Sequence, residues 1–247
     1  MASRAEMLRE LRLAPEWRLR NRAGEATADA GKPPERAPAA SLPNAATRLE
    51  RIATLGWDAF AADVEACTAC GLCRTRNKAV PGVGDVRAQW MLIGEAPGAE
   101  EDARGEPFVG QAGKLLDNML AALGMNRREN VYIANVLKCR PPANRTPVPV
   151  EVDACRPYLE RQIALVQPKL ILALGKSAAS LLLGTDASIA SLRGRVHRVR
   201  DVPLVVTYHP AYLLRSLQEK AKAWDDLLFA RRTLAAFLSE AGTAASE

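Results

Sequence analysis

The chain has 247 residues, of which 48% are hydrophobic and 25% charged, values typical of a globular domain with a sizeable core. Its 34 Lys and Arg outnumber its 28 Asp and Glu, and the net charge of +6 favours a polyanionic partner without requiring one. No apolar run approaches the roughly 20 residues that cross a bilayer, and the N-terminus lacks the apolar core of a secretory signal. The composition argues against a membrane partner, and we expect a cytoplasmic protein.

Three segments precede the first strand-like pattern. Residues 2–22 have the pattern of an amphipathic helix, and the Ala-, Pro- and Gly-rich stretch 23–43 is typical of a flexible linker. Apolar residues at helical spacing predict a second helix over 46–66. We therefore expect an N-terminal helix with its linker, one folded domain and a disordered tail, over residues 1–45, 46–240 and 241–247.

Short apolar runs then alternate with helical patterns along the rest of the chain. The runs, which are typical of buried strands, are 90–93, 131–134, 170–174 and 204–207. The helical patterns lie at 114–123, 149–165, 177–183 and 221–239. This alternation predicts an α/β fold, a three-layer α/β/α sandwich around a central four-stranded parallel sheet.

Distinctive residues follow the predicted strands at the points where they end. Glu95 follows the first strand, Asn135 ends the second, Lys176 follows the third and His209 follows the fourth. Ligands of open α/β sheets bind outside the carboxyl ends of the strands. We expect these four segments to converge on one binding site.

The five cysteines are the second chemical signal. Cys67 and Cys70 form a Cys-x-x-Cys hook, and Cys139 and Cys155 lie further along the chain. A reducing cytosol disfavours disulfides, and four thiolates suit either zinc or an iron–sulfur cluster, so the spacing leaves the metal open. Cys73 is expected to be a small buried residue rather than a ligand.

Six motifs occur in order between residues 67 and 234. They are Cys67-x-x-Cys70, 80-VPGVG-84, 94-GEAPGAEED-102, 107-PFVG-110, 135-NVLKCRPP-142 and 209-HPAYLLR-215. The set resembles the family 4 uracil-DNA glycosylases. The resemblance implies a DNA-repair enzyme with a [4Fe-4S] cluster of structural role on Cys67, Cys70, Cys139 and Cys155, and Cys73 as an extra thiol.

The chemistry of uracil removal assigns roles to three residues. A base inside a duplex must be flipped into a pocket before its glycosidic bond can be reached, and Phe108 is expected to stack on it. The Asn135 amide matches uracil N3–H and O4, whereas cytosine presents the reversed pair. His209 is expected to stabilise the negative charge that develops on uracil O2. A core phenylalanine and a turn-forming asparagine are the structural alternatives.

Further assignments rest on the same resemblance. Glu95 is expected to orient a water or the base, the backbone around Ala96 to contact the base, and Glu101 to crowd the position of the thymine methyl. Leu213, Leu214 and Arg215 form a wedge suited to filling the gap in the DNA, although a buried helix start is the alternative. The candidates for phosphate contacts are Arg74, Arg76, Lys78, Arg193, Arg195, Arg198 and Arg200.

Two alternative functions remain at this point. One is an iron–sulfur protein that traps uracil-DNA covalently through a histidine in the loop after the Phe108 motif, but no histidine precedes His197. The other is a non-catalytic uracil-DNA-binding iron–sulfur protein, against which the presence of Asn135 and His209 counts. We expect the partner to be uracil-containing single- or double-stranded DNA, the protein to be a monomer, and the N-terminal extension to be available to a replication or repair partner.

Overall fold

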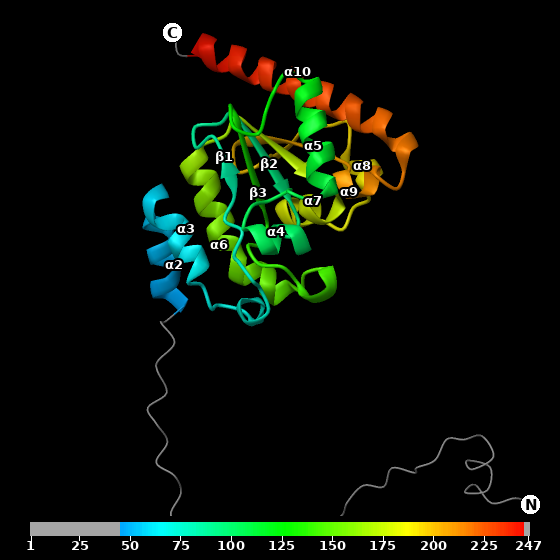
Figure 1. The fold of residues 1–247 in the computed structure, drawn as a ribbon. Coiled ribbons are helices and arrows are strands. Elements are labelled where there is room, and N and C mark those ends of the chain that lie inside the picture. The colour runs from blue at the N-terminus through cyan, green and yellow to red at the C-terminus, as the bar shows by residue number, and fades with distance from the viewer. Residues whose placement is uncertain (1–44, 245–247) are drawn as a thin grey trace, which may run out of the picture. The chain divides into compact units, whose positions relative to one another are not determined.

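A six-stranded sheet lies at the centre of the computed structural model of the protein (Figure 1), which describes the backbone of residues 45–244 and the side chains of residues 47–240. The predicted N-terminal helix and linker fall outside the described residues. The strand order is β1-β3-β2-β4-β6-β5. The strands are β1 (Val83–Gly84), β2 (Trp90–Gly94), β3 (Val131–Asn135), β4 (Leu170–Leu174), β5 (His197–Val199) and β6 (Val202–Thr207).

The four inner strands are those predicted from the sequence, and they are mutually parallel. The two edge strands, β1 and β5, are antiparallel to their neighbours and were not included in the predicted sheet. They have two and three residues, too few for a hydrophobic pattern to identify. The four-stranded parallel sheet is therefore confirmed as the centre of a six-stranded mixed sheet.

Helices cover both faces of the sheet. Those of the α/β core are α4 (Ala99–Arg104), α5 (Gln111–Ala122), α6 (Pro149–Val166), α7 (Lys176–Leu183), α8 (Ile189–Leu192), α9 (Pro210–Leu213) and α10 (Lys220–Ala244). Short 3-10 turns occupy Gly71–Arg74, Pro142–Asn144 and Leu217–Glu219. Helix α10 continues four residues into the segment 241–247 that was expected to be a disordered tail.

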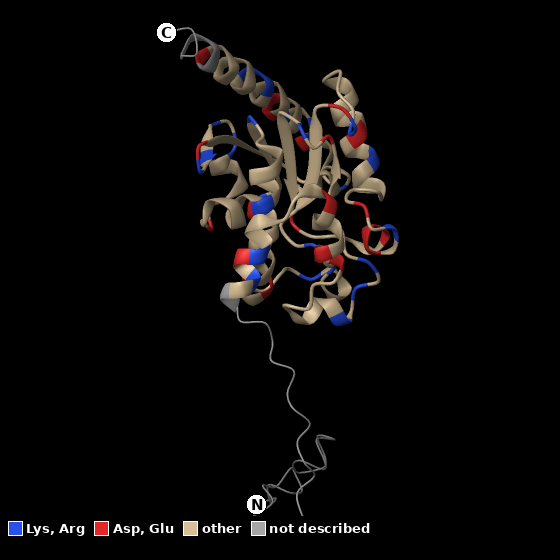
Figure 2. Cartoon of the chain, turned by 90° about the vertical axis from the view of Figure 1, so that its left-hand side faces the viewer, with Lys and Arg blue, Asp and Glu red and all other residues tan. Residues whose placement is uncertain are grey.

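Two hydrophobic clusters fill the spaces between the three layers. On one face of the sheet, Leu116 and Leu120 of α5 and Leu227 of α10 pack with strand residues such as Leu92 and Leu172. On the other face, α6 and α7 pack against the alternate strand residues, because successive strand side chains point to opposite faces. The four inner strands carry no charged residue (Figure 2), as expected of strands buried on both sides.

The helix predicted over 46–66 is two helices, α2 (Ala45–Thr54) and α3 (Trp57–Glu65). Gly56 interrupts them, with an extended backbone that makes it the N-cap of α3. Both helices pack beside α6 through a cluster that includes Ile52, Phe60 and Tyr158. This packing brings the Cys67 hook, just after α3, next to α6, which carries Cys155.

Among the helices of the described residues, none combines the length and the apolar character needed to span a bilayer.

Candidate active site

A cavity of about 510 Å³ opens at the carboxyl edge of the parallel strands. Four segments form it: the loop between β2 and α4, the Phe108 loop before α5, the end of β3 with the loop that follows, and the turn from β6 into α9. Three of the four strand-end segments expected to converge, those of Glu95, Asn135 and His209, line this cavity. Lys176, after β4, does not line it, and the Phe108 loop completes the wall instead. All six residues predicted to bind the substrate line this cavity, namely Glu95, Ala96, Glu101, Phe108, Asn135 and His209.

Asn135 presents an unpaired acceptor to this cavity. It is the last residue of β3 and only 2% exposed, and its side-chain oxygen Oδ1 has no hydrogen-bond partner among the described residues. A buried polar atom without a partner costs free energy, about 1–3 kcal/mol. A ligand N–H that donates to Oδ1 would recover this cost, and so the turn-forming alternative, which requires a local backbone partner, does not describe this side chain.

His209 is held in one tautomer. Its Nδ1 accepts a hydrogen bond from the backbone N–H of Ala211, at 3.1 Å. Burial, reinforced by the charge of Arg215, lowers the pKa of the imidazole to about 4, so the ring is neutral near pH 7. A neutral ring that accepts at Nδ1 carries its proton on Nε2, which makes Nε2 a hydrogen-bond donor.

Phe108 lies beside this histidine. The centroids of the two rings are 5.5 Å apart and the ring planes differ by 30°. Phe108 is 5% exposed and adopts φ = 54°, a left-handed conformation that is uncommon for a residue other than glycine. Strained backbone of this kind clusters at functional sites, although Gln167 and Arg200 also adopt it away from the cavity.

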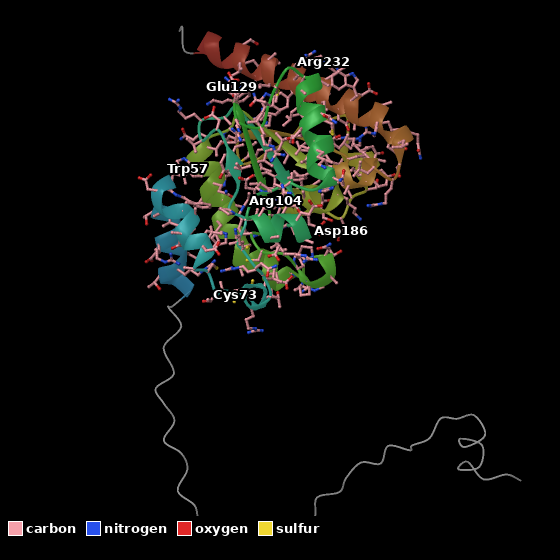
Figure 3. All side chains as sticks on the ribbon, in the orientation of Figure 1. Trp57, Cys73, Arg104, Glu129, Asp186 and Arg232 are labelled. Carbon is pink, nitrogen blue, oxygen red and sulfur yellow. The ribbon has the colours of Figure 1, made fainter. Side chains whose placement is uncertain are left out.

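The five cysteines line a second, small cavity beneath α3 and α6, and all five are free thiols. Cys73, expected to be a small buried residue, is half-buried and lines this cavity with the other four. Figure 3 shows it at the end of the domain away from α10. Within the described residues, no set of three or more His, Cys, Asp or Glu is arranged as a ligand set for a metal ion. A four-iron cluster spreads its thiolates more widely than one ion, because each thiolate binds a different iron.

Two arginines and one backbone N–H contact three of these thiols. Arg48 Nη2 lies 3.7 Å from Cys67 Sγ and Arg76 Nη1 lies 3.0 Å from Cys139 Sγ. The backbone N–H of Lys138 donates to Cys155 Sγ at 3.4 Å. Donors and cations of this kind stabilise thiolates and the negative charge of a thiolate-bound cluster, so the residues present fit such a group.

Lys138 connects the two sites. Its side chain is fully buried, and its Nζ donates to the backbone oxygen of Asn135 at 2.7 Å and to Oε1 of Gln162. Burial lowers the pKa of this amine to about 7. The loop that carries Cys139 is thereby tied to the strand end that presents the Asn135 amide.

The sequence of this chain is similar to those of known uracil-DNA glycosylases. The model of the uracil DNA glycosylase superfamily matches residues 81–228. The type-4 uracil-DNA glycosylase of Archaeoglobus fulgidus is 45% identical over 165 residues, which cover 64% of this chain and 82% of that protein. The type-4 enzyme of Thermotoga maritima is 46% identical over 155 residues, 62% of this chain and 80% of its own length.

The chain belongs to the type-4 uracil-DNA glycosylase family. A type-5 uracil-DNA glycosylase of Pyrobaculum aerophilum is also similar, at 32% identity over 153 residues, 56% of this chain and 67% of that protein. The family assignment made from the six motifs is confirmed.

Glu101 of this family member holds the loops that shape the cavity. Its Oε2 accepts from the backbone N–H of Gly98 at 3.1 Å, and its Oε1 accepts from Val109 at 2.9 Å and from Gly110 at 3.1 Å. These bonds join the start of α4 to the Phe108 loop. The carboxylate oxygens are thus occupied by backbone amides, while Glu95 and Ala96 line the cavity half-buried.

Leu213, which was predicted to be part of the DNA wedge, is a core residue in the structure. Leu213 is 1% exposed and packs with Tyr208 and Ala223, because α9 turns it toward α10, so the buried helix start describes it. Leu214 is 42% exposed. Arg215 is exposed and lines the cavity.

The sequence patterns assigned no site role to several of the lining residues. Pro141 lies within the motif 135–142, Asn144, Arg145 and Thr146 follow it, and Tyr212, 39% exposed, lies three residues after His209. The left-handed backbone of Asn144, φ = 54°, turns this loop back. The sequence signal was the Pro-Pro-Ala-Asn turn composition, which indicates a loop but not the cavity that it borders.

Two of the seven basic candidates for phosphate contacts are engaged inside the protein. Arg76 binds Cys139. Arg193 forms two bonds with Asp226, of 2.6 and 2.9 Å, and its side chain is 14% exposed. Partners within the protein therefore account for both arginines, and neither needs a contact with DNA.

Proposed function

We propose that this protein is a uracil-DNA glycosylase that flips uracil out of DNA and hydrolyses its N-glycosidic bond, leaving an abasic site for base-excision repair. One observation carries the proposal: the buried, unpaired Oδ1 of Asn135 lines the same cavity as a neutral histidine with an available Nε2–H. An acceptor and a donor at these two positions match a pyrimidine ring with an N–H group and a carbonyl that gains negative charge.

The Asn135 amide supports selection of uracil over cytosine. Uracil N3–H donates to Oδ1 and uracil O4 accepts from the amide nitrogen, whereas cytosine N3 is an acceptor and its 4-amino group a donor. Cytosine would leave Oδ1 unpaired and place two acceptors face to face. A site built to form hydrogen bonds rejects a base that cannot form them, because its buried polar groups then remain without partners.

His209 supports departure of the base. As the C1′–N1 bond breaks, its electron pair goes to the uracil ring, negative charge appears on O2 and positive charge on the sugar. A hydrogen bond from Nε2–H to O2 stabilises this charge at a buried position, where preorganised donors are most effective. Water then adds to C1′, and the proton that it loses balances the departed uracil anion, which completes the hydrolysis. We assign the orientation of this water to Glu95.

The remaining contacts hold the flipped nucleotide. The Phe108 ring provides a stacking surface beside His209, and backbone at Ala96 borders the base. Leu214 is the exposed apolar residue suited to fill the gap in the stack, and Arg215 is suited to a phosphate. These roles require one chain, in agreement with a monomer that acts on uracil-containing DNA.

We further propose that Cys67, Cys70, Cys139 and Cys155 hold a [4Fe-4S] cluster. The cluster would supply a covalent cross-link between the hook after α3, the loop after β3 and helix α6, and it would transfer no electrons in the hydrolysis. The support is the shared cavity of the thiols and the donors directed at them from Arg48, Arg76 and Lys138.

The test of the function is excision from a uracil-containing oligonucleotide, followed by cleavage of the abasic site. We expect strand breaks with the uracil strand and none with cytosine or thymine in its place. Unbroken strands with retained binding would show the non-catalytic alternative. An adduct that survives denaturation would show covalent trapping.

The cluster is tested separately from the activity. We expect the purified protein to be brown, with iron and acid-labile sulfide, whereas colourless protein that contains zinc would refute the cluster.

A further inference from the structure

The left-handed backbone of Phe108 requires support from its surroundings. Its carbonyl group lies against the start of α5, where a Cβ on Gly113 would stand 1.8 Å from Phe108 O. No residue with a side chain fits at position 113 without moving this carbonyl. A non-glycine residue in the left-handed conformation is strained, and it persists only where neighbouring groups enforce it.

Arg127, in the loop between α5 and β3, supplies such a group. Its Nη2 donates to Phe108 O at 2.8 Å and its Nη1 donates to Pro107 O at 3.3 Å. Its Nε donates to Asp117 Oδ1 of α5, also at 2.8 Å. The Arg127 side chain is 19% exposed, so this guanidinium is fixed by three acceptors rather than extended into solvent.

Glu101 holds the same loop from its other end. It accepts from the backbone N–H groups of Val109 and Gly110, while Arg127 donates to the carbonyl groups of Pro107 and Phe108. Phe108 is therefore held from two sides. The Arg127 guanidinium binds its carbonyl group, and the Glu101 carboxylate binds the N–H groups of the next two residues. Between them, the Phe108 ring is presented 5.5 Å from the His209 ring.

We propose that Arg127 is a positioning residue for the base-stacking ring: through the carbonyl groups of residues 107 and 108, it holds Phe108 in the left-handed conformation that directs the ring into the cavity. This inference rests on the proposed function, because it assumes that Phe108 stacks on uracil. Arg127 itself does not line the cavity. A lysine, with one nitrogen, cannot reproduce the planar fork that reaches two carbonyl groups and a carboxylate.

The experiment compares Arg127→Met, Arg127→Lys and the control Arg128→Met in the complete protein. Arg128 is the next residue along the chain and is exposed. We expect Arg127→Met to lower the single-turnover excision rate by about 10- to 100-fold, as misplacement of a contact group does. Inhibition by free uracil should weaken, while affinity for undamaged DNA stays as in Arg128→Met. Arg127→Lys should recover only part of the loss.

A double-mutant cycle with Phe108→Ala separates positioning from general damage. If Arg127 acts through the ring, Arg127→Met has little further effect on the excision rate once Phe108 is alanine. An equal loss in both backgrounds, or an Arg127→Met rate equal to that of Arg128→Met, would overturn the inference. Absence of excision by the unmodified protein would instead refute the proposed function.

Discussion

Gly94 and Asn135 are paired at the last position of two adjacent parallel strands, and the amide oxygen of Asn135 occupies the space that a side chain on residue 94 would need. A Cβ on Gly94 would stand 2.4 Å from Asn135 Oδ1 and 2.7 Å from Cζ of Phe108. The absence of a side chain at residue 94 is thus a condition for placing both the recognition amide and the stacking ring.

Gly94→Ala should disable the site while the protein stays folded. The added methyl group displaces Asn135 or Phe108, and a displacement of about 1 Å in a catalytic site can reduce the rate by about 100-fold. The single-turnover excision rate measures the effect. Gly56→Ala is the control, because a Cβ there meets no atom within 4 Å. Normal excision by Gly94→Ala would show that the two residues do not need this arrangement.

The stability of the protein should depend on pH through His209. The imidazole has a pKa of about 4 in the folded protein and an ordinary value of 6.5 when unfolded. Between these values the unfolded chain binds a proton that the folded chain does not. The free energy of unfolding therefore falls as the pH falls from about 6.5 to about 4, by up to about 3 kcal/mol.

Thermal unfolding at pH 7 and pH 5 measures this dependence. His209→Gln removes the buried titrating group, so its unfolding temperature should fall less between the two pH values than that of the unmodified protein. Parallel changes in the two proteins would contradict the assignment of a neutral, buried imidazole.

Leu213 and Leu214 should separate into a core residue and a DNA contact. Leu213→Ala should lower the free energy of unfolding by about 2–5 kcal/mol, as truncation of a buried leucine does. Leu214→Ala should change stability by less than about 0.5 kcal/mol, yet reduce excision from duplex more than from single-stranded DNA, since only a duplex leaves a gap to fill. Equal losses on both substrates would argue against the wedge.

The cysteines should differ although they share one cavity. Cys70→Ser should lose the brown colour and most of the iron and sulfide, because a proposed ligand is removed. Cys73→Ser should keep all three, since the other four thiols complete the ligand set. The measurement is the iron and acid-labile sulfide content of both purified variants. Loss of iron in Cys73→Ser but not in Cys70→Ser would show that Cys73 is the ligand and Cys70 the extra thiol.

Much of the architecture follows from patterns within the sequence. Four uncharged strands with intervening helices specify the parallel sheet, since each strand must be covered on both faces. The carboxyl ends of parallel strands share one edge, and this places Glu95, Asn135 and His209 together. The break at Gly56 was missed, although glycine is a poor residue for a helix interior, and the short edge strands carry too few residues to show a pattern.

The tertiary structure decided which loop and helix residues face the core, the cavity or the solvent. Leu213 and Leu214 are adjacent leucines in one motif, and the packing of α9 against α5 and α10 buries the first and leaves the second exposed. Glu101 holds two loops because the chain returns to it at Val109 and Gly110. Sequence spacing records which residues are near along the chain, whereas burial and hydrogen-bond partners depend on segments that meet only after folding.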